Sequence, residues 1–161
     1  MAKFRSGFGY DAHRFERGRR MMLCGIQIPC EYGLAGHSDA DAPLHALTDA
    51  LLGALALGDI GKMFPDTEEA YRDADSVELL KKAYSLEPFR EWEISSIDIT
   101  IVAQKPKISP HTDAMRERIA SALGIGSDCV SIKGKTTEGM GFCGRGEGLQ
   151  TFAQVLLERK G

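Results

Sequence analysis

The sequence predicts an α+β fold, in which a small mixed β-sheet carries helices packed on one face. Segments that alternate like β-strands are interleaved with segments of helical periodicity. The spacing between them requires both hairpins and longer crossovers, which together produce a mixed sheet. A length of 161 residues suits one domain with a substantial core, and no break in composition marks a second. We therefore expect a single domain over residues 1–161.

The chain begins with two predicted strands, over residues 3–15 and 21–28. In the first, Gly7 and Gly9 permit a bulge or the close approach of another backbone. The second contains a glycine break and stops at Pro29.

A largely apolar helix is predicted next. Asp39 or Asp41 can cap its N-terminus, Pro43 occupies a tolerated first-turn position, and Gly58 can end it in a left-handed conformation. The remaining predicted elements are a helix over 76–86, a strand over 95–104, a helix over 109–123 and strands over 130–133 and 149–157. The first of these begins with a capping box formed by Asp75 and Glu78.

Overall composition excludes several classes of partner. The net charge of −3 provides no general attraction for nucleic acid or for an anionic membrane, and no apolar run approaches the length of a membrane span. The N-terminus lacks the apolar segment of a secretory signal. The four cysteines show no close paired spacing and are interpreted as free thiols, so we expect a cytoplasmic protein.

A line of polar side chains crosses the apolar helix. Asp41, His45 and Asp49 recur every four residues, and burying them costs several kcal/mol unless they are paired or bound to metal. Asp11 and His13 are two residues apart, so on a strand they point to the same face. With His45 they would supply the two imidazoles and one carboxylate of an open zinc site. The alternative is that each histidine is simply hydrogen-bonded within the fold.

A glycine-dense segment over 135–148 follows the predicted strand at 130–133. Gly134-Lys135-Thr136 is similar to the end of a P-loop, but the first glycine of that motif is replaced by Cys129, and we reject the assignment. Hydroxyl groups, backbone N–H groups and Arg145 can hold phosphate oxygens, and Glu138 can hold a divalent cation. An ordinary glycine-rich turn is the alternative. Likewise, His37 before the helix can donate to a phosphate or be a surface residue.

Four separated blocks of sequence, taken in order, resemble one family. They are Gly9-Tyr10-Asp11-Ala12-His13; His37-Ser38-Asp39-Ala40-Asp41 through Gly53; Leu57-Gly58-Asp59-Ile60-Gly61 through Thr67; and Thr136-Thr137-Glu138 with Gly141-Phe142 and Gly144-Arg145-Gly146-Glu147-Gly148. Over nearly its whole length the chain resembles the 2-C-methyl-D-erythritol 2,4-cyclodiphosphate synthase family of the non-mevalonate isoprenoid pathway. Lys135 and Cys24 depart from the residues most common there, threonine and glycine respectively.

The resemblance implies two metal sites and shared active sites. A zinc ion would be held by Asp11, His13 and His45, and a second divalent cation, Mg²⁺ or Mn²⁺, would be held by Glu138 on the substrate diphosphate. The matches to His37 and Thr136 would assist the transition state. The family also implies a homotrimer, with the zinc site and the cytidine pocket contributed by neighbouring subunits.

The resemblance further implies which residues bind the substrate. Methylerythritol phosphate, cytidine and the phosphates would be bound by Asp11, Ala12, His13, His37, Ser38, Asp59, Ile60, Gly61, Phe64, Pro65, Asp66, Thr67, Glu68, Ala103, Gln104, Lys105, Pro106, Lys107, Ile108, Ser109, Lys135, Thr136, Thr137, Glu138, Phe142 and Arg145.

The implied activity is that of a phosphorus–oxygen lyase. The 2-phosphate of 4-diphosphocytidyl-2-C-methyl-D-erythritol 2-phosphate would attack the β-phosphorus, closing 2-C-methyl-D-erythritol 2,4-cyclodiphosphate and expelling CMP. A fused cytidylyltransferase domain, seen in bifunctional relatives, is not expected. Two other classes remain open: a zinc-dependent protein that only binds a phosphorylated ligand, and a metal-dependent phosphohydrolase.

Overall fold

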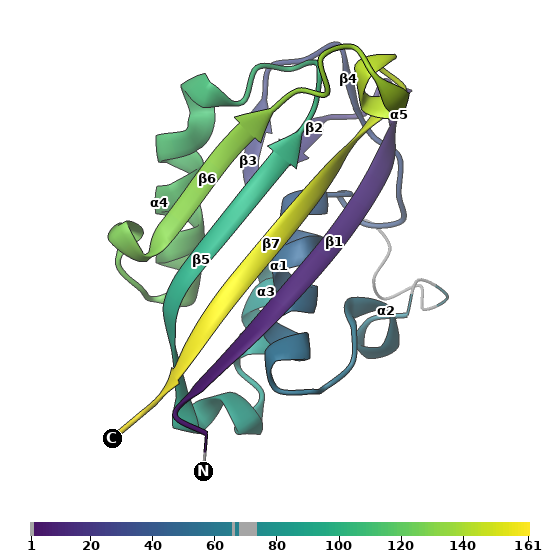
Figure 1. The fold of residues 1–161 in the computed structure, drawn as a ribbon. Coiled ribbons are helices and arrows are strands. Elements are labelled where there is room, and N and C mark those ends of the chain that lie inside the picture. Colours follow the sequence, from purple (N-terminus) through teal and green to yellow (C-terminus); the bar gives the residue numbers. More distant parts are fainter. Residues whose placement is uncertain (1, 66, 68–73) are drawn as a thin grey trace.

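The computed structural model describes residues 2–65, 67 and 74–161 (Figure 1). Within these residues a five-stranded sheet has the order β4-β1-β7-β5-β6. Its strands are β1 (Phe4–Arg17), β4 (Tyr32–Leu34), β5 (Trp92–Val102), β6 (Val130–Lys135) and β7 (Gly148–Arg159). Neighbouring strands are antiparallel except for the parallel pair β5–β6. The predicted α+β class with a mixed sheet is confirmed.

The helices lie on one face of this sheet (Figure 1). They are α1 (Ala42–Ala54), α3 (Ser76–Tyr84) and α4 (Thr112–Leu123), with short helices α2 (Ile60–Met63) and α5 (Gly141–Gly144) in the connections. Single 3₁₀ turns occupy Glu87–Glu91, Ser109–His111 and Ser127–Cys129. The core lies between α1, α3, α4 and the inner face of the sheet. None of the described helices has the length and apolar character needed to cross a membrane.

The central pair of the sheet, β1 and β7, comes from opposite ends of the chain. Phe4 pairs with Glu158 and Arg14 with Gly148, with every residue between them in register. Alternate residues of β1 therefore face the helices, among them Gly7, Gly9 and Asp11.

Helix α1 lies directly against β1 because two glycines leave room for it. A Cβ atom at Gly7 would lie 1.8 Å from the carbonyl oxygen of Ala50, and one at Gly9 would lie 1.8 Å from that of Ala46. The predicted close approach of another backbone is thus confirmed. It determines how far α1, and with it His45, lies from the strand.

The end of α1 differs from the prediction. The helix stops at Ala54, and Ala56 takes the left-handed conformation (φ 57°) expected of Gly58. The N–H of Ala56 donates to Gly53 O and that of Leu57 to Leu52 O, at 3.0 and 2.9 Å. These paired bonds form a Schellman motif, which satisfies the last carbonyl groups before Gly58 is reached.

The predicted second strand is also corrected. It is a hairpin of β2 (Met21–Leu23) and β3 (Ile26–Ile28). Its two turn residues, Cys24 and Gly25, have φ of 54° and 76°. Positive φ at both positions is required by a type I′ turn, whose twist matches that of the flanking strands.

Most predicted helix ends are confirmed. Asp41 caps α1, Asp75 caps α3 through the N–H of Val77 (2.8 Å), and left-handed Gly124 ends α4. The predicted capping box is only half formed, since Glu78 pairs with Lys81 at 3.0 Å.

The rejected P-loop is excluded structurally, because residues 130–135 form strand β6.

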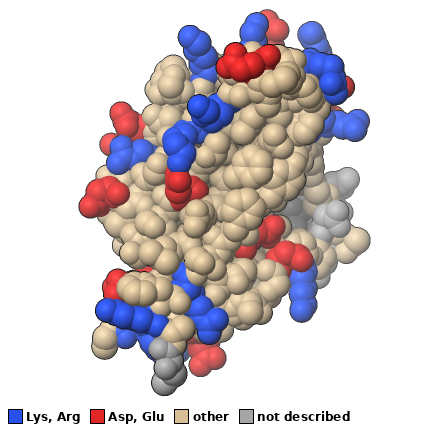
Figure 2. Space-filling model, viewed as in Figure 1, with Lys and Arg blue, Asp and Glu red and all other residues tan. Residues whose placement is uncertain are grey.

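The outer face of the sheet carries apolar side chains and is covered by no described helix (Figure 1). Phe4, Phe8 and Tyr10 of β1 are 48%, 65% and 47% exposed. The ring of Phe152 on β7 lies 6.2 Å from that of Phe8 and 5.3 Å from that of Tyr10. Figure 2 shows that charged side chains gather around the ends and edges of this face and leave its middle largely uncharged. Apolar patches of this kind mark interaction surfaces.

Candidate metal centre and substrate pockets

Three side chains from two elements meet between β1 and α1. Asp11 and His13 project from the same face of β1, and His45 projects from the first turns of α1. The Asp11 Oδ2 atom lies 2.8 Å from His13 Nε2 and 3.1 Å from His45 Nδ1. Possible ligand atoms of the three residues all lie within 4.8 Å of one another. The sequence prediction that these residues converge is confirmed.

The second nitrogen of each imidazole ring is also bound. His13 Nδ1 donates to the carbonyl oxygen of Ala35 at 2.5 Å. His45 Nε2 lies 3.0 Å from Ser76 Oγ and 3.2 Å from Ser38 Oγ. Metal-binding histidines characteristically use their second nitrogen in this way, because it fixes the orientation and tautomer of the ring.

The electrostatics of the cluster favour an ionised carboxylate. Burial would raise the pKa of Asp11, but hydrogen bonds from His13 and His45 and their positive charges lower it to about 2. Burial likewise opposes protonation of His13, yet its hydrogen bond to Asp11 leaves its pKa raised. Two nitrogens and one carboxylate oxygen are a donor set typical of divalent metal sites with an open coordination position. The residues present therefore fit a divalent cation.

The other members of the polar line on α1 have structural roles. Asp41 is fully buried and accepts hydrogen bonds from the N–H groups of Cys24, Gly25 and Leu44 at 2.9, 2.6 and 3.2 Å. Asp49 accepts the N–H of Ile60 at 2.7 Å. Of the two outcomes expected for the buried polar line, Asp41 and Asp49 show pairing, with backbone N–H groups, and His45 joins the possible metal ligands.

A hollow of about 380 Å³ opens beside the cluster. It is lined by His13, Gly36, His37, Ser38, His45, Ile60, Gly61, Phe64 and Leu79. The Nε2 atom of His37 is buried and has no hydrogen-bond partner among the described residues. An unpaired buried nitrogen is costly and provides a site for a polar ligand.

Arg19 holds the loop that carries His37, a contact that the sequence did not reveal. Its guanidinium donates to the carbonyl oxygens of Gly36 and Ser38 at 2.6 and 2.7 Å, on either side of His37. It also lies 3.7 Å from the carboxylate of Glu16. Arg19 follows a glycine in a charged turn, and no local pattern distinguishes it from a solvated residue.

The connection that follows α1, residues 59–68, contributes only some of its predicted substrate residues to this hollow. Asp59 caps α2 by accepting the N–H of Lys62 at 2.8 Å, which places Ile60 and Gly61 at the wall. Pro65 is half-buried and Thr67 is exposed. The predicted substrate residues Asp66 and Glu68 lie outside the described residues.

Residues 103–109, the segment that the family resemblance implies for cytidine binding, line a separate hollow of about 170 Å³. Its walls are Ala103, Gln104, Pro106, Lys107, Ile108, Ser109, Gly134, Lys135 and Thr136. The N–H of Ala103 donates to Lys135 O at 2.9 Å, joining the two predicted stretches. Lys105, between wall residues, is exposed. Among the described residues, this hollow and the one at the metal centre share no lining residue.

Glu138 lies away from the three-residue cluster and is exposed. Its Oε1 lies 3.2 Å from Thr136 Oγ1. The Thr137 hydroxyl donates to Met140 O, so it stabilises the loop rather than pointing freely outward. Glu138 is thus placed next to the smaller hollow and not at the metal centre.

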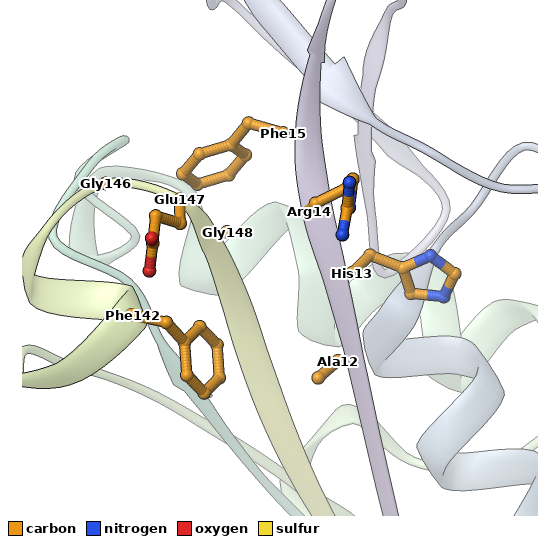
Figure 3. Close-up of a pocket in the computed structure, with 8 residues that line it drawn as sticks. All are labelled: Ala12, His13, Arg14, Phe15, Phe142, Gly146, Glu147 and Gly148. Carbon is orange, nitrogen blue, oxygen red and sulfur yellow. The ribbon is translucent and has the colours of Figure 1, made fainter.

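A third, wider hollow of about 750 Å³ lies between β1 and the start of β7 (Figure 3). Ala12 and Phe142 line it, and Figure 3 shows Ala12 directed toward Phe142 while the ring of His13 turns to the other side of β1. Arg145 pairs with Glu147 at 2.9 Å. The structure therefore separates Ala12 and Phe142 from the hollow that contains His37.

The fold and the cluster define a class: an α+β domain with an open Asp-His-His site for a divalent cation between strand and helix. Comparison with known proteins identifies the family. The model of the YgbB family matches residues 4–158, and the chain belongs to this family.

Several relatives that match nearly the whole chain share one name. A protein of Neisseria gonorrhoeae named 2-C-methyl-D-erythritol 2,4-cyclodiphosphate synthase is 54% identical over 99% of both chains. A solved structure of a synthase of that name in a CDP-bound form superposes with a TM-score of 0.87 at 38% identity, over 96% of this chain and all of the other. The structure of the bifunctional IspDF from Campylobacter jejuni gives a TM-score of 0.92 at 42% identity over 98% of this chain. The present chain spans 42% of that longer protein.

Proposed function

We propose that the chain is a 2-C-methyl-D-erythritol 2,4-cyclodiphosphate synthase. It converts 4-diphosphocytidyl-2-C-methyl-D-erythritol 2-phosphate to the cyclic diphosphate and CMP. One bond forms, from a 2-phosphate oxygen to the β-phosphorus, and the bond from that phosphorus to the oxygen of the departing CMP breaks. The observation that carries the proposal is the convergence of Asp11, His13 and His45 beside a hollow of about 380 Å³, in a chain that is 54% identical to a relative of this name over 99% of both chains.

The barrier to this reaction is largely electrostatic, because both reacting phosphates are anions. A zinc ion held by Asp11, His13 and His45 would supply positive charge and Lewis acidity to a phosphate oxygen when bound. The partnerless Nε2 of His37 supports its role as a donor to phosphate, and Thr136 supplies a hydroxyl at the other hollow. The attacking phosphate is already ionised near neutral pH, so His37 orients and donates rather than acting as a base.

The second cation is proposed to lie at Glu138. A single exposed carboxylate leaves most coordination positions to substrate phosphates and water, as Mg²⁺ and Mn²⁺ sites on nucleotides commonly do. Lys107 and Lys135, which line the adjoining hollow, would offset the remaining negative charge.

Two observations support a homotrimer with active sites between subunits. The apolar outer face of β1 and β7 is suited to packing against other copies. The two sets of predicted substrate residues lie in separate hollows of one chain, so a neighbouring subunit is needed to bring them together. Four free cysteines support a reducing, cytoplasmic location.

Product analysis tests the reaction. A synthase releases CMP and cyclic diphosphate in equal amounts. A phosphohydrolase would instead release inorganic phosphate, and a binding protein would leave the substrate unchanged, so either result contradicts the proposal.

The metal assignment has its own test. His45→Ala should lose zinc and most activity, as elemental analysis and the same product assay would measure. Full zinc content in that variant would remove His45 from the site.

Mixing two inactive variants tests the shared site. His45→Ala inactivates the half of the active site that holds the zinc, and Glu138→Ala inactivates the half that binds the cytidine diphosphate. When the two variants exchange subunits at random, three-quarters of the trimers contain both. Each mixed ring contains one interface with both sides intact, so activity should recover to roughly a quarter of the unmodified enzyme. No recovery, with exchange verified by mass, would show that each subunit carries a complete site.

A further inference from the structure

The second nitrogen of His45 lies in a buried polar network that joins α1 to α3. Nδ1 faces Asp11, while Nε2 lies 3.0 Å from the hydroxyl oxygen of Ser76, the first residue of α3. Ser76 is 1% exposed, so water does not compete for this hydroxyl.

Both carboxylate oxygens of Asp39 are bound to Ser76. The Ser76 hydroxyl donates to Asp39 Oδ1, and the backbone N–H of Ser76 donates to Oδ2 at 3.0 Å. The N–H of Asp41 also donates to Oδ1 at 3.2 Å, which keeps the carboxylate in place from the side of α1.

The direction of each hydrogen bond follows from the chemistry of the groups. An ionised carboxylate only accepts, and a serine hydroxyl has a single hydrogen. Since Ser76 gives that hydrogen to Asp39, its oxygen can only accept from His45, which must then carry a proton on Nε2. With Nε2 protonated, the nitrogen left to coordinate a cation is Nδ1, which faces Asp11 and His13, and the cation would take the place of the hydrogen bond from Nδ1 to Asp11.

A competing arrangement shows what this network prevents. Ser38 Oγ lies 3.2 Å from the same nitrogen and could donate to it. Nδ1 would then carry the proton, which would point toward the metal position and block coordination.

We propose that Asp39 is a positioning residue of the metal centre, acting through Ser76 to hold His45 in the tautomer and orientation that bind a cation. The proposal rests on the metal site of the proposed function, and it assigns no contact between Asp39 and substrate. The proposal thus assigns Ser76, the first residue of α3, a part in metal binding, whereas its local sequence predicts only the capped start of a helix.

Zinc affinity measured by chelator competition, without substrate, tests the proposal. Asp39→Asn and Ser76→Ala should each weaken zinc binding by roughly ten- to a hundredfold, the usual effect of losing such an outer partner. Visible spectra of the Co²⁺-substituted protein should change in both variants. Asp75→Ala is the matched control: it removes the cap of α3 at Val77 but leaves the network intact, so affinity should stay within about twofold.

A double variant separates a linked network from general destabilisation. If Asp39 acts through Ser76, the Asp39→Asn/Ser76→Ala protein should bind zinc about as weakly as Ser76→Ala alone. Additive losses, or unchanged affinity in the single variants, would overturn the proposal. Absence of zinc binding by the unmodified protein would instead refute the metal site of the proposed function.

Discussion

Replacing Gly9 by alanine should displace α1 from β1 and disturb the metal centre. The added Cβ would lie 1.8 Å from Ala46 O, 2.8 Å from Ala46 C and 3.0 Å from Ala50 N. All three are backbone atoms of α1, so no side chain can rotate away to relieve the clash. Ordinary contact begins near 3.4 Å, so helix and strand must separate by roughly 1.5 Å.

This displacement acts on two metal ligands at once. Ala46 follows His45 directly, and Gly9 precedes Asp11 by two residues along the same strand. Metal–ligand distances tolerate deviations of only about 0.2 Å, so a separation of this size should abolish tight zinc binding. If the helix resists moving, the strain should instead lower the free energy of unfolding by roughly 1–3 kcal/mol, the usual cost of overpacking.

Zinc titration and urea unfolding of Gly9→Ala would measure both effects. Gly53→Ala, on α1 where an added Cβ meets nothing within 4 Å, is the matched control and should raise stability by up to about 1 kcal/mol. Normal zinc affinity together with normal stability in Gly9→Ala would refute the packing described for α1 and β1.

Three further predictions concern a loop, a buried acid and a thiol. Arg19→Lys cannot bridge both carbonyl groups beside His37, so kcat should fall roughly ten- to a hundredfold at unchanged zinc content, whereas Arg17→Ala should retain activity. Burial raises the pKa of Asp41 from 3.8 to about 6, despite the backbone N–H donors around it. The folded chain then holds this proton more tightly than the unfolded chain, so the contribution of Asp41 to stability falls as pH rises through this window. Urea unfolding in EDTA should show that slope, and Asp41→Asn should flatten it. Burial also raises the pKa of the Cys24 thiol well above 9, so Ellman's reagent should modify it far more slowly than half-buried Cys30 until the protein is unfolded.

Local rules predicted the elements and most of the metal centre because those features depend on short spacings. Two residues on a strand share a face, and this brought Asp11 and His13 together. The apolar periodicity and the caps placed His45 on a buried helix. The same rules failed where a residue other than glycine took a left-handed conformation: Ala56 ended α1 early, and Cys24 turned a predicted strand into a hairpin.

Contacts between distant segments could not be read from the sequence. The roles of Arg19 and Ser76 depend on neighbours about 17 and 31 residues away, and each residue has an ordinary local interpretation. Asp41 and Asp49 had the spacing of functional residues, but the tertiary fold supplied backbone donors to both. A polar line on a buried helix thus indicates that partners exist, without indicating whether they are ligands or peptide groups.

The pairing of β1 with β7 constrains how the protein is made. Residues 4–14 find their central partner only when residues 148–158 have been synthesised. Until then the edges of β1 and β5 that β7 covers remain unpaired, although β4 and β6 can already pair with their other edges. Such long-range pairing slows folding and prolongs exposure of apolar strands to aggregation. We expect stalled nascent chains lacking β7 to be protease-sensitive throughout, and protection of β1 in them would contradict this. The enzyme should therefore depend on chaperones chiefly during synthesis, rather than after release.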